Sequence, residues 1–351
     1  MHTRIIATVG PQSFSYPVLS KLVTSGVDII RLNFSHAKIE QLNDLKNNLQ
    51  RIKEETDCQT KIMQDLQGPR IRIGRLDQEI ELVDGETYVF TGGQASLANQ
   101  EIPIDDPDLY QDLRIGDPIF LANGELELKI VDIKDKMIYA RVERGGLLMS
   151  HKGINLPNTN LTRGGLTKKD IADVEAAFEY NVDYIALSFV QSADDLRRLR
   201  KIIGNRPIGL IAKIERAIAL EVIDEIIKES DGIMVARGDL GIELPMEDLP
   251  IIQKNLVRHA HWHGKPAIIA TQMMTSMIEH PRPTRAEVSD IANAVLDGAD
   301  ALMLSDETAV GLYPNQAVAA MKKIICRTES YLNNRNYFDT ETAAFYCHYV
   351  N

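Results

Sequence analysis

Residues 208–241 read IGLIAKIERAIALEVIDEIIKESDGIMVARGDLG, and this stretch decides the fold class. It begins and ends with short runs rich in Ile, Val and Ala, at 208–214 and 232–237. Runs of this kind are typical of parallel strands that are buried on both faces. A helical pattern lies between them, so the stretch predicts a strand–helix–strand unit.

The same alternation continues through most of the 351 residues. Helical patterns separate six further strand-like runs, at 4–9, 28–34, 61–66, 184–190, 267–272 and 301–305. Eight strands that alternate with helices favour an α/β fold, a (β/α)8 TIM barrel, over an open and doubly wound sheet.

Two helical patterns stand out in the last third of the chain. One covers 286–297 and is followed by Gly298 as a candidate C-cap, and the other covers 315–332. The tail from 331 to 351 has no clear periodicity, so either a last helix packed on the barrel or a partly disordered end fits it. The apolar residues that recur at 3.6-residue spacing in the first pattern are Val288, Ile291, Ala292, Val295 and Leu296.

One stretch interrupts the alternation. Between about residues 71 and 160 the hydrophobic pattern has a period of two with tight turns, as at 79–85 and 124–130. We interpret it as a small antiparallel β-barrel, a lid domain, inserted after the third barrel strand. The barrel domain then comprises 1–70 and 161–351, about 260 residues, close to the ~250 that such barrels need.

Composition and charge restrict the function. The chain has 39 Lys and Arg against 50 Asp and Glu, a formal net charge of −11 and a pI of about 5.3. This balance argues against nucleic acid or a membrane surface as partner, because both need a basic face, but it leaves anionic metabolites open. The chain shows no signal peptide and no apolar run of ~20 residues, and three scattered cysteines suggest no disulfide framework. We therefore expect a cytoplasmic protein.

Charged residues gather where the predicted strands end, which is where parallel barrels place their active sites. Lys213 and Glu215 are two residues apart on one strand and so point to the same face. Glu215 and Asp239, on adjacent strands, are placed to share a divalent cation, with Lys213 and Arg31 adding positive charge. Such a set suits phosphoryl transfer to or from an anionic substrate, although a structural ion pair at the barrel rim is an alternative interpretation of Lys213 and Glu215.

Other motifs in the sequence give less information about function. No GxxxxGK[ST] sequence is present, so a P-loop is not the nucleotide site. His259 and His263 have the i, i+4 spacing of metal ligands on a helix, but without a third ligand nearby we assign them to a helix end. We expect Trp262, Met273 and its neighbours Met274 and Met277 to serve packing.

The residues quoted so far resemble the pyruvate kinase family, in a short form without the C-terminal regulatory domain. The resemblance implies a barrel with a lid, no activation by a sugar bisphosphate, and phosphoryl transfer between phosphoenolpyruvate and ADP to give pyruvate and ATP. It implies small-molecule substrates and allows a homo-oligomer through the barrel domain. The segments that carry it are 3–11, 31–36, 152–157, 213–215, 231–241 and 270–307.

The resemblance also implies roles for single residues. Lys213 stabilises the transferring phosphoryl group, Arg31 binds it, and Thr271 lies near the carbon to be protonated. Glu215 and Asp239 hold Mg²⁺ or Mn²⁺. The implied catalytic residues are thus Lys213, Thr271 and Arg31, and the substrate-binding residues are Arg31, Lys213, Gly238, Asp239 and Thr271. Nucleotide-binding positions are Arg72, Lys169, Asn33 and His36, and a monovalent-cation site comprises Asn33, Ser35, Asp65 and Leu66.

Several positions depart from the family pattern. After the third strand, Leu66 replaces the usual Thr and Arg70 replaces an acid, and relatives with a basic residue there tend not to need potassium. We therefore predict potassium-independent activity, with Arg70 as the replacement for the monovalent cation. Ala122 and Asn123 stand where a lid carboxylate is usual, and Asp306 adds a carboxylate after the last strand.

These departures leave two alternative functions open. One is a related phosphotransferase that acts on a different 2-oxo or 2-hydroxy acid or a different nucleotide. The other is a catalytically weak paralogue with a regulatory role, against which the intact Lys213, Glu215, Asp239 and Thr271 argue.

Overall fold

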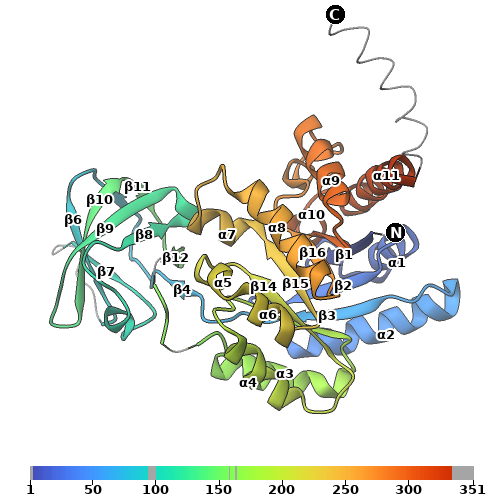
Figure 1. Ribbon diagram of the computed structural model, residues 1–351, viewed down its shortest axis with the longest axis horizontal. Coiled ribbons are helices and arrows are strands. Elements are labelled where there is room, and N and C mark those ends of the chain that lie inside the picture. Colours follow the sequence, from blue (N-terminus) through green and yellow to red (C-terminus); the bar gives the residue numbers. More distant parts are fainter. Residues whose placement is uncertain (1–2, 94–99, 158, 163, 334–351) are drawn as a thin grey trace, which may run out of the picture. The chain divides into compact units, whose positions relative to one another are not determined.

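The computed structural model describes residues 3–93, 100–157, 159–162 and 164–333 (Figure 1). Eight parallel strands form one closed barrel in the order β1-β17-β16-β15-β14-β13-β3-β2. All eight runs recognised in the sequence are strands of this barrel, so the predicted (β/α)8 class is confirmed. The barrel strands are β1 (Arg4–Thr8), β2 (Ile29–Asn33), β3 (Lys61–Asp65), β13 (Tyr184–Leu187), β14 (Gly209–Ile214), β15 (Gly232–Ala236), β16 (Ala267–Ala270) and β17 (Ala301–Leu304).

Helices follow the barrel strands along the chain, as the alternating sequence predicts. The longest ones carry one buried apolar stripe each and bury it against the barrel. They are α1 (Tyr16–Thr24), α2 (Ile39–Thr56), α3 (Lys168–Ala177), α4 (Ala193–Ile203), α5 (Ile218–Glu221), α6 (Ile223–Glu229), α7 (Arg237–Glu243), α8 (Leu249–Trp262), α9 (Arg285–Asp297), α10 (Asp306–Ala309) and α11 (Pro314–Asn333), with short 3₁₀ turns η2 (Leu109–Gln111), η3 (Ala122–Gly124), η4 (Phe178–Tyr180) and η5 (Thr275–Ile278).

Packing divides the chain into two compact units, 1–64 with 260–351 and 65–259. In the first unit β1 pairs with β2 and β17 in parallel register, with Ala7 opposite Leu304. In the second, β14 lies between β13 and β15, with Ala212 opposite Leu187 and Lys213 opposite Met234. The interior strands β14 and β15 are buried along their whole length apart from the half-buried Gly209, as expected of strands covered on both faces.

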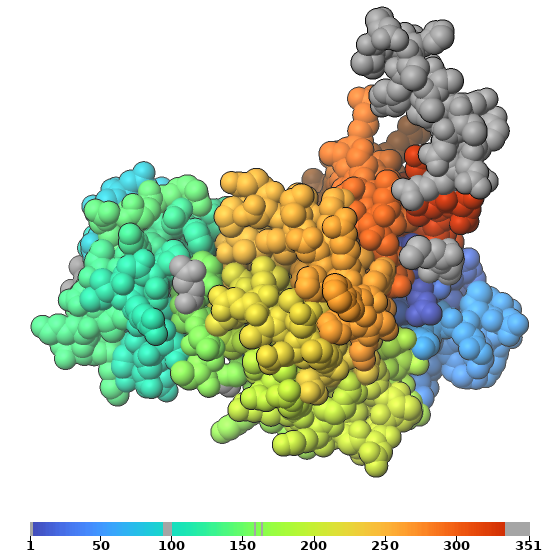
Figure 2. Space-filling view, in the orientation of Figure 1, coloured from blue at the N-terminus to red at the C-terminus, as the bar shows by residue number. Residues whose placement is uncertain are grey.

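The interrupting stretch folds as its own β structure, which we call the insert sheet; its residues are cyan to green in the space-filling view (Figure 2). Its seven strands run in the order β4-β12-β8-β9-β10-β6-β7, and β11 pairs with β5 in a separate two-stranded antiparallel sheet. The two end strands of the order meet, because Ile73 bridges Ile104 and the Gly74 amide donates to the Pro103 carbonyl at 2.7 Å. The strands are β4 (Ile71–Arg72), β5 (Ile80–Leu82), β6 (Thr87–Thr91), β7 (Glu101–Pro103), β8 (Pro118–Leu121), β9 (Leu126–Lys134), β10 (Met137–Arg144), β11 (Gly146–Leu148) and β12 (Gly153–Asn155).

The insert sheet curls around a core of its own. Alternate residues of β9 and β10, such as Leu128 and Ala140, are fully buried, which is the period of two seen in the sequence. All its pairs are antiparallel except β6 with β7, which run parallel. That exception departs from the antiparallel expectation, and β6 and β7 are joined by residues 92–100 rather than by a tight turn.

For helix α9 the hydrophobic periodicity predicts the helix and its end correctly, but it predicts too many buried residues. It covers Arg285–Asp297 and ends at Gly298 in the left-handed region (φ 98°), as predicted. Ile291 and Val295 are buried, but Val288 and Leu296 are 37% and 46% exposed, so they lie at the edge of the buried stripe. The expectation that Trp262 serves packing is wrong, because its side chain is 87% exposed at the end of α8.

The chain's last helix and its methionines agree with the sequence. The helical run at 315–332 is α11, and Met273, Met274 and Met277 are fully buried. Residues 334–351, most of the tail that the sequence left undecided, lie outside the described part of the chain. None of the helices in the described part is both long and apolar enough to span a bilayer.

Glu287 at the start of α9 offers a test of local stability. Its carboxylate accepts hydrogen bonds from the Ser276 amide (2.8 Å) and hydroxyl (2.5 Å) and from the Thr284 amide (2.7 Å) and hydroxyl (2.9 Å). Partial burial alone would raise the pKa of Glu287, but these hydrogen bonds outweigh it and lower the pKa below its ordinary value.

We expect Glu287→Ala to lower the free energy of unfolding by about 1–2 kcal/mol at pH 7 in urea titrations. Because the pKa is lowered in the folded state, the contribution of Glu287 is present above the ordinary carboxyl pKa and is lost as the pH falls through the lowered pKa. The difference between wild type and variant should therefore shrink in acid. Glu279→Ala, at an exposed glutamate nearby, is the control. An equal loss in both variants would contradict the capping role.

Candidate active site

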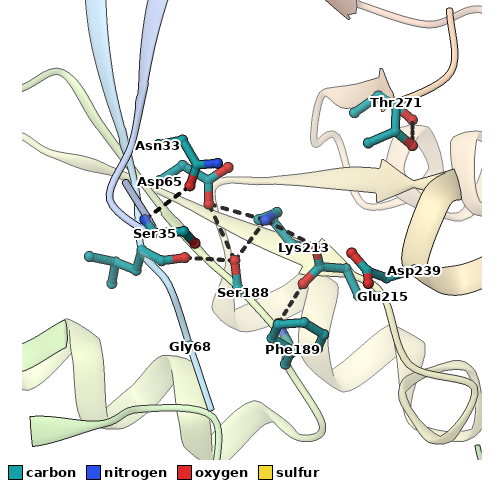
Figure 3. Close-up of polar contacts among 12 residues, drawn as sticks. Asn33, Ser35, Asp65, Gly68, Ser188, Phe189, Lys213, Glu215, Asp239 and Thr271 are labelled. Carbon is teal, nitrogen blue, oxygen red and sulfur yellow. Dashed lines mark hydrogen bonds and ion pairs between the residues drawn. The ribbon is translucent and has the colours of Figure 1, made fainter. Parts of the chain in front are cut away.

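The carboxyl ends of β3, β14 and β15, which with β13 are consecutive strands of the barrel, place charged side chains together in the unit 65–259. Lys213 and Glu215 come from the end of β14, Asp65 from the end of β3, and Asp239 from the first turn of α7, directly after β15 (Figure 3). The Lys213 Nζ lies 2.9 Å from Glu215 Oε1. The predicted common face of these two residues is thereby confirmed, and it follows from the two-residue period of a strand.

The Lys213 ammonium is nearly enclosed by oxygen atoms. Besides Glu215 it contacts Asp65 Oδ1 at 3.1 Å and donates to the Ser188 hydroxyl at 2.6 Å. Its side chain is 9% exposed and those of the two carboxylates 1% and 3%. Because an ammonium has only donors, the Ser188 oxygen must accept from it, and the hydroxyl then donates to the Leu66 carbonyl at 2.7 Å. Ser188 therefore fixes the direction in which Lys213 points.

Glu215 is held at both oxygens. Oε1 receives Lys213, and Oε2 accepts the backbone amide of Phe189 at 2.7 Å. Phe189 has φ 54°, in the left-handed region that an aromatic residue rarely adopts, and this turns its amide towards the carboxylate. Burial raises the pKa of Glu215; the Lys213 ammonium opposes that shift, and the charge of Asp239 adds to it.

Asp239, predicted to share a divalent cation with Glu215, lies beside this cluster. Its side chain is 20% exposed and its charge acts on Glu215. Two carboxylates with a water- or substrate-accessible side are the protein ligands that magnesium prefers. Among the described residues no group of three or more His, Cys, Asp or Glu side chains is arranged to hold a metal.

Arginines from the start of the insert lie on the same side. Arg70 Nη2 is 3.5 Å from Asp239 Oδ1, so this residue contacts a predicted ligand of the divalent cation. Arg72 donates to the His151 carbonyl at 3.0 Å; partial burial and then the neighbouring Arg70 lower its pKa. Lys169, expected to bind nucleotide, forms an i, i+4 ion pair with Asp173 at 2.6 Å on α3.

Gly238 lies in the first turn of α7, in the same unit, and the other predicted residues belong to the unit 1–64 with 260–351. Arg31, in the middle of β2, is buried and donates to the Thr8 hydroxyl at 2.8 Å. Asn33 accepts the Ser35 amide at 3.1 Å and so orders the turn after β2, at which His36 is exposed.

Thr271 and its neighbour Gln272 depart from ordinary backbone geometry. Their φ angles are 69° and 54°, directly after β16, and the Thr271 hydroxyl donates to the Ala270 carbonyl at 2.6 Å. A β-branched residue in the left-handed region is strained, and strain of this kind gathers at functional sites. Thr271 is therefore marked by a strained backbone in the structure as well as by its place in the predicted site.

The sequence analysis missed Ser188 and Phe189. Both follow β13, so the rule that singled out polar residues at strand ends would have found the serine, whereas nothing in a sequence marks the left-handed phenylalanine. The histidines agree with a helix-end assignment: His259 pairs with Asp224 and His261 with Asp300, each at 2.9 Å.

Comparison with known proteins identifies the family. A family model described as pyruvate kinase, barrel domain, matches residues 1–318, and a pyruvate kinase of Agrobacterium vitis is 43% identical over 95% of this chain and 69% of its own length. The chain belongs to the pyruvate kinase family. A second relative, the pyruvate kinase of Thermococcus litoralis, is 40% identical over 95% of this chain and 71% of the relative.

A solved pyruvate kinase structure, from Cryptosporidium parvum, superposes with a TM-score of 0.89 at 37% identity and covers 94% of this chain and 69% of that one. The chain is thus an enzyme of the transferase class, a pyruvate kinase-like phosphotransferase. For this pyruvate kinase family member, the Lys213 cluster is the part of the described structure best suited to the chemistry.

Ser188 gives this site a specific test. Ser188→Ala removes one of three acceptors of the Lys213 ammonium and should lower kcat about tenfold, since losing one buried hydrogen bond costs about 1–2 kcal/mol. The measurement is steady-state turnover of phosphoenolpyruvate and ADP. Ser230→Ala is the matched control, because Ser230 is also buried and donates to a backbone carbonyl, that of Ile227. Equal kcat values in the two variants would contradict the orienting role of Ser188.

Proposed function

We propose that the protein transfers a phosphoryl group between phosphoenolpyruvate and ADP, giving pyruvate and ATP. The observation that carries the proposal is the ammonium of Lys213, held by Asp65, Ser188 and Glu215 beside the carboxylate of Asp239. A fixed positive charge next to a two-carboxylate set is what a transferring phosphoryl group and its counter-ion require.

Each residue then has a part in the reaction. Glu215 and Asp239 would hold Mg²⁺ or Mn²⁺, which when bound supplies charge neutralisation at the phosphoryl oxygens. Lys213 stabilises the negative charge of the phosphoryl group as its bond to the enol oxygen breaks and its bond to the ADP oxygen forms. The resulting enolate takes up a proton at carbon to give pyruvate.

The other unit contributes the remaining groups of the proposal. Arg31 binds the phosphoryl group, and Thr271 lies near the carbon that is protonated. We assign Gly238 with Asp239 to the substrate carboxylate, and Arg72, Lys169, Asn33 and His36 to the nucleotide. These assignments are supported by family membership and by the positions of the residues: most lie in or directly after barrel strands, Arg72 lies at the start of the insert, and Lys169 lies in the first turn of α3 after the insert.

We also propose that activity does not need potassium. The acid usual at residue 70 is an arginine, and its guanidinium already provides a cation 3.5 Å from Asp239. Two groups predicted for the monovalent-cation site have protein partners: the Leu66 carbonyl accepts from Ser188, and Asp65 contacts Lys213.

We extend the proposal to the setting of the enzyme. Residues 71–160 act as a lid over the barrel formed by 1–70 and 161–351, and the substrates are small molecules in the cytoplasm. A homo-oligomer through the barrel domain is compatible with the family. Asp306, exposed at the start of α10 after β17, favours one alternative, a different 2-oxo or 2-hydroxy acid or a different nucleotide as substrate.

The proposed reaction is tested by pyruvate formation from phosphoenolpyruvate and ADP with Mg²⁺. We expect Lys213→Met to lower turnover at least ~1,000-fold, because the stabilising charge is lost from a water-poor site. Lys201→Met, at an exposed lysine of α4, should behave as wild type. Wild-type turnover no better than that of Lys213→Met would reject the proposal, and a screen of hydroxy acids and nucleotides would then separate the related phosphotransferase from a regulatory paralogue.

The cation requirement is tested separately with a buffer free of sodium and potassium. Wild-type activity should change less than about twofold when potassium is added, because Arg70 supplies the positive charge. Arg70→Glu should lose most activity and regain part of it in ~100 mM potassium, a concentration that screens little at short range. Activity of the wild type that depends on potassium would contradict this part of the proposal.

A further inference from the structure

Arg216 is a buried cation that the proposed reaction does not use. It follows Glu215 directly, and its side chain is 4% exposed. The guanidinium Nε lies 2.7 Å from Glu243 Oε1, and Glu243 Oε2 accepts the Ala217 amide at 2.8 Å. Burial raises the pKa of Glu243, and the Arg216 charge opposes that shift. The carboxylate is thus anchored on both oxygens next to the end of β14.

The guanidinium also reaches the chain that leaves the insert sheet, residues 156–157 and 159–162, which we call the return linker. Nη2 donates to the carbonyl of Leu156 at 3.0 Å and to that of Thr159 at 2.6 Å. The Thr159 amide closes a turn on the Leu156 carbonyl at 3.1 Å. Buried carbonyls need donors, and Arg216 supplies one to each of these.

The return linker is connected to Arg72 through one strand pair. It continues from β12, which pairs with β4 so that Gly153 stands opposite Arg72. Arg72 in turn donates to the His151 carbonyl, just before β12. A shift of the linker is therefore transmitted to Arg72 through one strand pair.

Glu243, the partner of Arg216, connects the same point to the carboxylates of the site. It is the last residue of α7, whose first turn carries Asp239, and Arg216 itself is joined to Glu215 by a peptide bond. Helix α7 also packs against β12 and η3 of the insert sheet. One ion pair thus touches both elements that bear the proposed ligands of the divalent cation, and the linker as well.

Packing alone does not hold the linker at this place. A cavity of about 20 Å³ is lined by Arg216 and Glu243 and by residues from both chain crossings into the insert, among them Pro69, Arg70, Leu156 and Leu161. That volume admits about one water molecule. Leu156 and Leu161 are buried in the core of the insert, and hydrogen bonds from Arg216 and Gln191 add to this packing in holding the return linker.

We propose that Arg216 is a positioning residue that fastens the return linker of the insert to the carboxylate-bearing elements and thereby sets the position of Arg72. The kinetic part of this inference rests on the proposed function, whereas the linker part does not. The guanidinium is suited to this task because it forms an ion pair with one carboxylate through Nε while its Nη2 donates to two carbonyls, and the shorter reach of a lysine ammonium from a single nitrogen does not match this spread.

The first test is hydrogen exchange measured by mass spectrometry on the full chain. In Arg216→Lys the charge beside Glu243 is kept but the fork is lost, so the peptide carrying Thr159 and Leu161 should exchange about tenfold faster, with the other barrel peptides unchanged. Glu243→Gln should accelerate the same peptide, because the guanidinium loses its anchoring charge. Arg200→Lys is the matched control, since Arg200 pairs with Asp231 at 2.8 Å away from the insert.

The second test is the dependence of turnover on each substrate. Arg216→Lys should raise KM for ADP about fivefold and leave KM for phosphoenolpyruvate within about twofold, because Arg72 is the group displaced. A linker peptide that exchanges as in Arg200→Lys, or faster exchange in all peptides alike, overturns the fastening role. Faster linker exchange with an unchanged KM for ADP overturns the connection to Arg72. If the wild type does not act on phosphoenolpyruvate and ADP, the proposed function fails, and the exchange data still decide the fastening role.

Discussion

The burial of the Lys213 ammonium group determines which side chains must surround it in the candidate site. Lys213 has left water almost completely, and a buried charge is tolerated only when opposite charges and hydrogen-bond acceptors surround it. Three residues meet that requirement: Asp65 at the end of β3, Ser188 directly after β13, and Glu215 directly after β14. The barrel brings these groups within 3.1 Å of one nitrogen atom, because the neighbouring parallel strands β3, β13 and β14 end on the same side. Burial raises the pKa of Glu215, the Lys213 ammonium opposes that shift, and the charges of Asp239 and Asp65 add to it. The divalent cation of the proposed site would offset these negative charges.

Much of this arrangement could be predicted from the sequence because it depends on short-range periodicity. The common face of Lys213 and Glu215 follows from the two-residue period of a strand, and the barrel follows from eight apolar runs. Helix α9 shows the limit of the same argument: a spacing of 3.6 residues finds the stripe, but whether Val288 and Leu296 are covered depends on the neighbouring helices. The prediction for Trp262 failed for the same reason, since the hydrophobicity of a side chain does not say whether another element of the fold covers it.

Contacts between residues far apart in the chain could not be predicted. Ser188 stands 25 residues before Lys213, and Glu243 stands 27 after Arg216 in the sequence, so no local pattern joins them. Backbone strain is equally invisible: Phe189 and Thr271 occupy the left-handed region although their side chains disfavour it. In Phe189 the strained backbone aims an amide at Glu215, so the unfavourable conformation is matched by a charge-assisted hydrogen bond.

The position of Arg70 gives a new interpretation of the arginine that replaces the family's usual acid at this residue. The sequence placed this arginine at the monovalent-cation site, and the structure shows its guanidinium at a carboxylate proposed to bind the divalent cation. At 3.5 Å and with both side chains partly exposed, the pair is weak, of the order of 1 kcal/mol or less. A cation that binds Asp239 therefore has little to displace, while the arginine's charge stays within reach of an anionic substrate. Arg70 lies on the short chain segment that enters the insert, and its positive charge is permanent. Because its ion pair with Asp239 is weak, little free energy is lost when a cation or substrate replaces that contact.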